Sequence, residues 1–113
     1  MLALTAATRI YLYRAPCDMR KSFDGLCGLI RSELGADPLS GSLFVFVNRR
    51  RNMVKLIYWD RDGFMILFKR LERGCFKVPN MAAWDGQIDR CELSMLLEGI
   101  TPKKVSKRYV FRG

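Results

Sequence analysis

Two aspartates that flank one arginine, in the segment Asp60-Arg61-Asp62-Gly63, have the spacing best suited to metal chemistry. Two carboxylates on a tight turn can share a hard cation, and a third ligand could come from Asp24, Glu72 or Asp85. A metal-dependent nuclease is the enzyme that such a site would serve. The same residue types are also typical of a hairpin loop, in which Gly63 would take a positive φ. We therefore interpret the segment as a turn and predict no catalytic residues and no metal site.

The cysteines and the absence of histidine limit the remaining chemistry. The chain has four cysteines and no histidine, and no two cysteines have Cys-x-x-Cys spacing, so a zinc site would need four separated thiolates. Without histidine, Ser-His, Cys-His and His-metal mechanisms are excluded. We predict reduced, mostly buried thiols, no cofactor and no enzymatic activity. The cysteines are Cys17, Cys27, Cys75 and Cys91.

Positive charge is concentrated in two parts of the chain. The formal net charge is +9. Residues 49–77 contain nine Lys or Arg against three Asp or Glu, and residues 101–113 contain five against none, whereas residues 78–100 contain one against four. Such clustering favours a polyanionic partner, nucleic acid before anionic lipid. A basic surface that serves only solubility is the alternative.

Basic residues interleave with aromatic ones, which could combine phosphate contacts with stacking on Tyr11, Tyr13 or Trp59. The alternative is that Trp59, Phe64 and Phe68 are core residues and that only the basic ends of the side chains contact water. Three consecutive arginines in a predicted turn gain nothing from core packing, so they are the first candidates. The predicted nucleic-acid-binding residues lie in this turn, on the neighbouring strands and in the tail: Arg49, Arg50, Arg51, Lys55, Lys69, Arg70, Arg73, Lys103, Lys104, Lys107 and Arg108.

The elements that would position these residues begin with residues 43–77, where three apolar runs separated by short polar turns predict an antiparallel meander. The run Leu43–Val47 is apolar at every position, which predicts a central strand. We expect a further strand over Arg9–Tyr13 and a short last strand over Cys75–Val78. The predicted sheet therefore has four to five antiparallel strands.

Two helices complete the predicted domain. Apolar residues from Phe23 to Leu34 recur at helical spacing, with Asp18 or Ser22 as the cap and Gly35 as the stop. Gly25 and Gly28 within this helix predict close packing against the sheet. A second helix is expected from Trp84 to Gly99, with Asp85 and Asp89 in its first turns.

The expected fold class is therefore α+β, with a four- to five-stranded antiparallel meander, one long helix packed on it and a second, C-terminal helix. We expect one domain over residues 1–100 and a basic C-terminal arm over residues 101–113. The apolar runs are far shorter than the roughly 20 residues that a membrane-spanning helix needs, so we expect a cytoplasmic protein with no membrane contact.

Long ordered motifs resemble one family. The segments Asp18–Leu26, Asp37–Phe46, Asn48–Asp60, Asp62–Phe64 and Lys69–Phe76 are similar to the TnpB-type accessory protein, encoded by the second reading frame (Orf2-like) of bacterial insertion-sequence-66 (IS66) elements. The resemblance covers about residues 9–100, with a weaker match at Leu96–Ile100. It implies a small protein needed for transposition beside a separate transposase that carries the strand chemistry. The family supplies no catalytic residues to carry over.

These observations together favour a non-catalytic accessory protein of DNA transposition. We expect it to bind DNA phosphates, at the ends of the element, within a transposase complex. The alternative is a protein–protein adaptor that binds the transposase without direct DNA contact. DNA and the transposase are the expected partners, and a homo-oligomer formed through an exposed sheet edge is left open.

Overall fold

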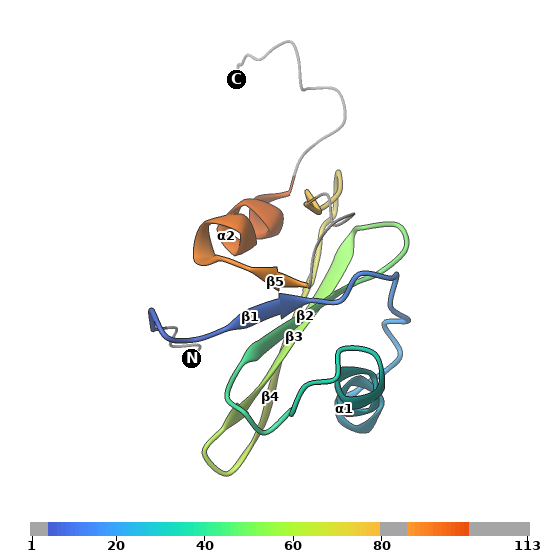
Figure 1. The fold of residues 1–113 in the computed structure, drawn as a ribbon. Helices are drawn as coiled ribbons and strands as arrows, with labels where there is room; N and C mark the ends of the chain where they lie inside the picture. The colour runs from blue at the N-terminus through green and yellow to red at the C-terminus, as the bar shows by residue number, and fades with distance from the viewer. Residues whose placement is uncertain (1–4, 80–85, 100–113) are drawn as a thin grey trace.

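A computed structural model describes residues 5–79 and 86–99 of the chain, which form one five-stranded sheet and two helices (Figure 1). This arrangement confirms the mixed α+β class. The strands lie in the order β4-β3-β2-β1-β5. The elements are β1 (Ile10–Leu12), α1 (Phe23–Ser32), β2 (Leu43–Val47), β3 (Met53–Asp60), β4 (Gly63–Arg70), β5 (Gln87–Ile88) and α2 (Arg90–Glu98).

The predicted meander is present as β2, β3 and β4, which pair antiparallel in sequence order. Val47 lies opposite Val54 at one end of the sheet, and Asp60 lies opposite Gly63 at the other. The two connecting turns are therefore at opposite ends of the sheet, as Figure 1 shows. Strand β2 is buried at all five positions, as its apolar pattern predicted.

Strand β1 departs from the predicted antiparallel sheet, because it pairs with β2 in parallel, with Ile10 opposite Leu43 and Leu12 opposite Val45. The physical reason is the connection between these strands. Helix α1 lies between them in sequence and returns the chain to the end of the sheet at which β1 began, so β2 runs in the same direction. The sheet is mostly, not wholly, antiparallel.

The predicted last strand over Cys75–Val78 is wrong, because this segment makes only an isolated bridge at Cys75. The backbone N–H of Phe76 donates to the Arg51 carbonyl at 2.6 Å, which ties the segment to the β2–β3 loop. The fifth strand is β5, which pairs antiparallel with β1 at the other edge of the sheet.

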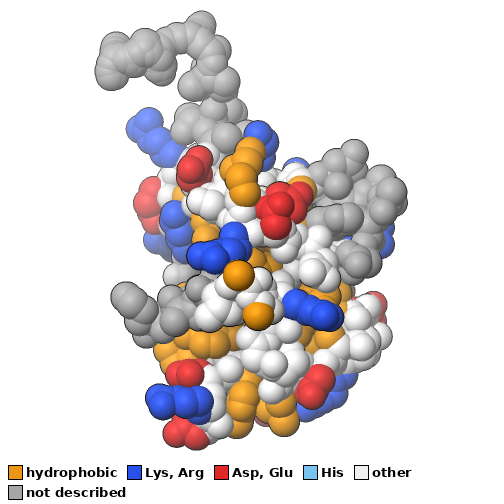
Figure 2. All heavy atoms as spheres, turned by 60° about the vertical axis from the view of Figure 1, so that its left-hand side comes forward, with side chains coloured by type: hydrophobic (Ala, Val, Ile, Leu, Met, Phe, Trp, Pro, Cys, Tyr) orange, Lys and Arg blue, Asp and Glu red, His pale blue; other side chains and the backbone are white. Residues whose placement is uncertain are grey.

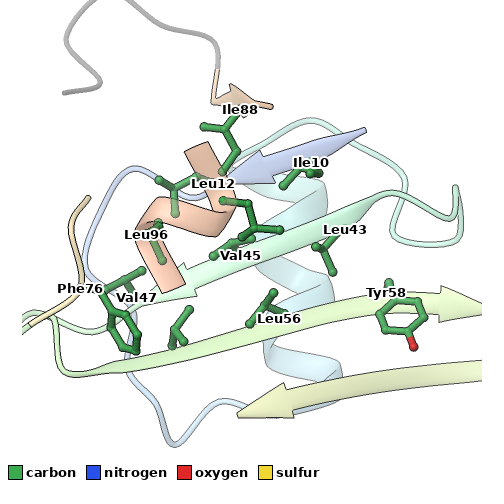
Figure 3. Packing of buried hydrophobic residues seen from close by; sticks show 12 residues of the cluster. Ile10, Leu12, Leu43, Val45, Val47, Leu56, Tyr58, Phe76, Ile88 and Leu96 are labelled. Atoms are coloured by element: carbon green, nitrogen blue, oxygen red, sulfur yellow. The ribbon is translucent and has the colours of Figure 1, made fainter. Parts of the chain in front are cut away.

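Each face of the sheet has its own apolar cluster. On one face, Leu93 and Leu96 of α2 join a cluster that includes Val45 and Leu56 (Figure 3). On the other face, α1 contributes Leu26, Cys27 and Ile30 to a cluster with Phe44 and Phe46. The two helices therefore cover opposite faces, and the side chains of β2 alternate between the two clusters.

Helix α1 differs from the prediction in its length and in its N-terminal cap. It has 10 residues, so the expectation of one long helix is not confirmed. Ser22 stands at its N-cap without a side-chain hydrogen bond, and Asp18 instead accepts hydrogen bonds from Arg20. Its stop is as predicted, since Gly35 has a φ of 60° and the following backbone N–H donates to Ile30 at 3.1 Å.

The glycines inside α1 do not pack closely against the sheet as predicted. A Cβ at Gly28 would meet open space, and one at Gly25 would meet the side chain of Lys21 at 3.2 Å. The sheet therefore gives no steric reason for either glycine.

Helix α2 is capped at both ends. The Asp89 side chain accepts from the backbone N–H of Glu92 at 2.7 Å, and the Glu92 carboxylate accepts from the Asp89 N–H at 2.9 Å. Gly99, with a φ of 73°, ends the helix. The predicted start at Trp84 is wrong, because Gln87–Ile88 form β5 and the helix begins at Arg90. Trp84 and Asp85 themselves lie outside the described residues. Neither of the two described helices has the length and apolar character to cross a bilayer.

A core substitution tests the two-sided burial of β2. Phe44 is fully buried and stacks on Tyr11 with a centroid separation of 5.5 Å. Phe44→Ala should lower the free energy of unfolding by about 3–5 kcal/mol, measured by urea denaturation. Phe23→Ala is the matched control, because Phe23 is 44% exposed, and its cost should stay below about 1 kcal/mol. Equal losses in the two variants would contradict this packing.

Candidate nucleic-acid interface

The loop between β2 and β3 is held by two asparagine side chains. Asn48 Oδ1 accepts from the backbone N–H groups of Asn52 and Met53, each at 3.0 Å. Asn48 Nδ2 donates to Asn52 Oδ1 at 2.8 Å, and the N–H of Arg51 donates to the Asn48 carbonyl at 3.0 Å. Because asparagine side chains replace backbone partners in this way, the loop has a defined conformation rather than a free one.

The segment after β4 supports the same loop from outside. Arg70 lies opposite Met53 in the β3–β4 ladder, and the Leu71 N–H then donates to the Asn52 carbonyl at 2.8 Å. With the Phe76 bond described above, two backbone hydrogen bonds bracket Arg73. The structure therefore brings residues 70–76 against the loop.

The three loop arginines are exposed at the tip of this scaffold. Arg49, Arg50 and Arg51 have exposed side chains, and within residues 5–79 and 86–99 none of them forms an ion pair. Arg51 has a φ of 60°, a backbone conformation that L-residues other than Asn and Asp rarely adopt. The loop therefore presents three adjacent cations to solvent.

Arg14 belongs to this region as well, although the sequence did not indicate it. The backbone N–H groups of Tyr13 and Cys17 donate to Val45 and Val47, each at 2.9 Å, so the chain after β1 runs beside the end of β2. A hollow of about 240 Å³ results, whose lining includes Arg14, Arg49 and Arg51. Arg14 reaches this end because β1 pairs with β2 in parallel, which no local sequence pattern indicates. We call this region the basic end of the sheet: Arg14, Arg49, Arg50, Arg51, Arg70 and Arg73.

The basic residues predicted on the strands, Lys55, Lys69 and Arg70, each make a contact within the protein. Lys55 is 9% exposed, and its Nζ donates to the Lys21 carbonyl at 2.7 Å and lies 5.1 Å from the Phe68 ring centroid. Lys69 Nζ donates to the Leu97 carbonyl at 3.0 Å, toward α2. Arg70 forms an exposed ion pair with Glu72 at 3.1 Å. The four basic tail residues, Lys103, Lys104, Lys107 and Arg108, lie outside the described part of the chain.

The aromatic residues considered for base stacking make contacts within the protein. Tyr11 and Tyr13 lie against Phe44 and Phe46, each with a centroid separation of 5.5 Å. Trp59 meets Phe64 edge to face at 5.1 Å. All three considered rings are half-buried, so core packing accounts for much of their surface. On the face that Figure 2 shows, the described Lys and Arg side chains are interspersed with Asp and Glu.

The Asp60–Gly63 segment is a turn, as predicted, but with a different residue at its strained position. Arg61 has a φ of 58°, so the prediction of a positive φ at Gly63 is wrong. The Asp60 carboxylate lies 3.8 Å from the Arg61 guanidinium. In the part of the chain that the structure describes, no three Cys, Asp or Glu side chains gather as metal ligands would.

The Asp18 carboxylate accepts hydrogen bonds from Arg20. Hydrogen bonds from the Arg20 side chain, and one from its backbone N–H, lower the pKa of Asp18 to about 2. The carboxylate is therefore ionised at neutral pH, and it organises the turn before α1 rather than acting as an acid.

The thiols have different environments. Cys17 and Cys27 are buried, Cys75 is half-buried and Cys91 is exposed. Burial is the main cause that raises the pKa of Cys17 and of Cys27. At neutral pH, a smaller fraction of each of these two thiols is ionised to thiolate, which is the reactive form.

Comparison with known proteins finds one matching family model and two similar proteins of one organism. A family model described as "IS66 Orf2 like protein" matches residues 8–107. The uncharacterized protein y4jC of Sinorhizobium fredii is 33% identical over 112 residues, which cover 99% of this chain and 96% of the relative. The uncharacterized protein y4hO of the same organism is 35% identical over 100 residues, or 88% of this chain and 87% of the relative. No solved structure matches the chain significantly.

Removal of the Asn48 side chain tests whether it holds the basic loop. Asn48→Ala leaves two backbone N–H groups without their acceptor, so the free energy of unfolding should fall by about 1–2 kcal/mol. In Asn48→Ala, hydrogen exchange of the Asn52 and Met53 backbone amides should also become faster. Asn48→Asp, which keeps the acceptor oxygens, should exchange more slowly at both amides than Asn48→Ala. Unchanged exchange in Asn48→Ala would contradict the scaffold.

Thiol labelling tests the burial of Cys17 and Cys27. A thiol-reactive chromophore should label Cys91 first in the folded protein at neutral pH. Cys17 and Cys27 should react only after urea unfolding, because burial both blocks access and raises their pKa. Mass spectrometry of the labelled peptides identifies the order, and early labelling of Cys27 would contradict it.

Proposed function

The chain belongs to the IS66 Orf2-like family, and from this membership we propose that it is a non-catalytic accessory protein of DNA transposition that binds DNA phosphates at the basic end of the sheet. Family membership supports the role in transposition. The DNA-binding part of the proposal rests on one observation about the fold: arginines from three separate segments meet at one end of the sheet, around a loop of defined conformation.

Electrostatics makes phosphate the natural ligand of such a cluster. Guanidinium groups match phosphate oxygens with two parallel N–H donors and stay charged at any physiological pH. The loop fixes the backbone of three of these arginines through the Asn48 and Asn52 side chains, so less conformational entropy is lost when DNA binds. The hollow beside Arg14, Arg49 and Arg51 could receive one phosphate group.

The proposed contacts differ from the sequence-based set at two positions. Arg14 is added, because it lines the same hollow as the loop arginines. Lys55 is left out, because a buried ammonium that donates to Lys21 is not available to a DNA backbone. Lys69 and the tail residues Lys103, Lys104, Lys107 and Arg108 stay in the proposal on charge alone, the tail as a basic arm beyond the folded domain.

The proposed partners are the ends of the element and its transposase, within the cytoplasm. An adaptor that binds the transposase without DNA is the second candidate. Met95 of α2, an apolar side chain that is 43% exposed, supports this candidate, because exposed apolar residues mark protein–protein contacts. The two candidates differ in how binding depends on salt.

Neutralisation of the loop arginines tests DNA binding. Fluorescence anisotropy with duplex DNA of the element ends should show affinity that falls steeply with salt. Arg49→Gln, Arg50→Gln and Arg51→Gln together should lower the affinity roughly tenfold or more and reduce the slope of log K against log salt by about 2 to 3. Arg14→Gln alone should weaken binding by a smaller factor.

The matched control carries the same change in net charge away from the basic end: Arg31→Gln, Arg61→Gln and Arg90→Gln, three arginines that are all exposed. If this control loses as much affinity as the loop variant, only the total net charge of the protein affects binding and the proposed site is wrong. No binding at low salt, together with retention of the protein on immobilised transposase, would support the adaptor instead.

A further inference from the structure

The outer edge of β4 is open for pairing. Strand β4 lies at one end of the strand order and, among the described strands, pairs with β3 alone. Because the hydrogen-bonding groups of an antiparallel strand alternate in direction, half of the N–H and C=O groups of β4 point away from β3. The strand is eight residues long, so this open edge is long for a protein of this size.

The exposed side chains of β4 are more apolar than is usual for an edge strand in contact with water. Phe68 is 56% exposed and Leu67 is 37% exposed, and Phe64, Met65 and Ile66 are half-buried. Exposed apolar residues on an open edge strand promote pairing with another strand. Proteins usually protect such edges with charges, and here the charges lie only at the ends of the strand.

These charges have opposite signs at the two ends. Asp60 ends β3 and Asp62 lies in the turn before β4, and Lys69 and Arg70 form the last two residues of β4. In antiparallel self-pairing, the beginning of one strand meets the end of the other. The acidic end of each copy would therefore meet the basic end of its partner strand.

The geometry points to a second copy of this chain as the occupant of this edge, and we propose that two chains pair antiparallel through β4 about a twofold axis at Ile66. The inference does not depend on the proposed function. The result is one continuous sheet of ten strands, twice the five of the single chain, with the same edge used by both copies, as twofold symmetry requires.

The faces of the sheet select this register. Side chains directly opposite each other in an antiparallel pair point to the same face, and Phe64, Ile66 and Phe68 share a face with Arg70. Even-numbered residues of one copy must therefore lie opposite even-numbered residues of the other. With Ile66 at the axis, Phe64 lies opposite Phe68 of the second copy, and Asp62 lies opposite its Arg70.

The neighbouring allowed register, with Leu67 at the axis, is less favourable. It sets Phe64 opposite Arg70 and Met65 opposite Lys69, and it brings Asp62 level with another acid, Glu72. Aromatic pairs and opposite charges stabilise cross-strand neighbours, and only the register at Ile66 provides both.

Sedimentation equilibrium of the full chain across a wide concentration range tests the dimer. The mass should rise from 13.1 kDa to twice that value. Asp62→Arg and Arg70→Asp should each raise the dimer dissociation constant roughly tenfold, because each sets like charges opposite each other at both ends of the pair. The double variant, which restores opposite charges in reversed order, should return the constant to within about threefold of the original protein.

Arg31→Asp is the matched control, with the same change in charge as Arg70→Asp on an exposed position of α1, and it should leave the dissociation constant unchanged. Circular dichroism checks that each variant is folded. A chain that stays monomeric throughout overturns the proposal. So does a dimer that the single variants leave intact, or a double variant that fails to recover.

Discussion

Burial of β2 on both faces is the constraint on which the rest of the structure depends. All five of its side chains are buried, and alternate residues of a strand point to opposite faces, so each face needs its own cover. Helix α1 closes one face and α2 the other. Because α1 must cross from the end of β1 to the start of β2, these strands run parallel. The covered faces leave the ends and the edges of the sheet as the places where a large partner can bind.

This arrangement explains why the aromatic and basic residues separate. Rings such as Tyr11 and Phe44 stack within the apolar cluster to which α1 contributes. Lys55, the one lysine of β3, donates to the Lys21 carbonyl just before α1. Arginines gather where strands end, because an end is not covered by either helix. The hydrogen bonds of the Asn48 and Asn52 side chains, which fix the loop backbone, therefore matter more to the proposed interface than any ion pair does.

The sequence predicted the three longest strands and their basic loop, but it missed details of caps and turns and the pairings between distant segments. Period-two apolar patterns identified β2, β3 and β4, and three consecutive arginines marked their loop, because these signals lie within a few residues of each other. The direction of β1, the position of β5 and the place of Arg14 depend on which segments meet across the fold, and no local pattern records that. The sequence placed Lys55 on a strand, but it did not indicate the Lys21 carbonyl to which the Lys55 ammonium donates.

Arg51 adds a positive charge to the loop, but its backbone conformation lowers the stability of the folded protein. At a φ of 60°, a residue with a Cβ costs roughly 1–2 kcal/mol relative to the right-handed conformation, and glycine escapes that cost. A chain selected for stability alone would have glycine or asparagine at this position. Arg51 therefore carries a conformational penalty, and replacing it with glycine would relieve that strain but leave one cation fewer at the tip of the loop.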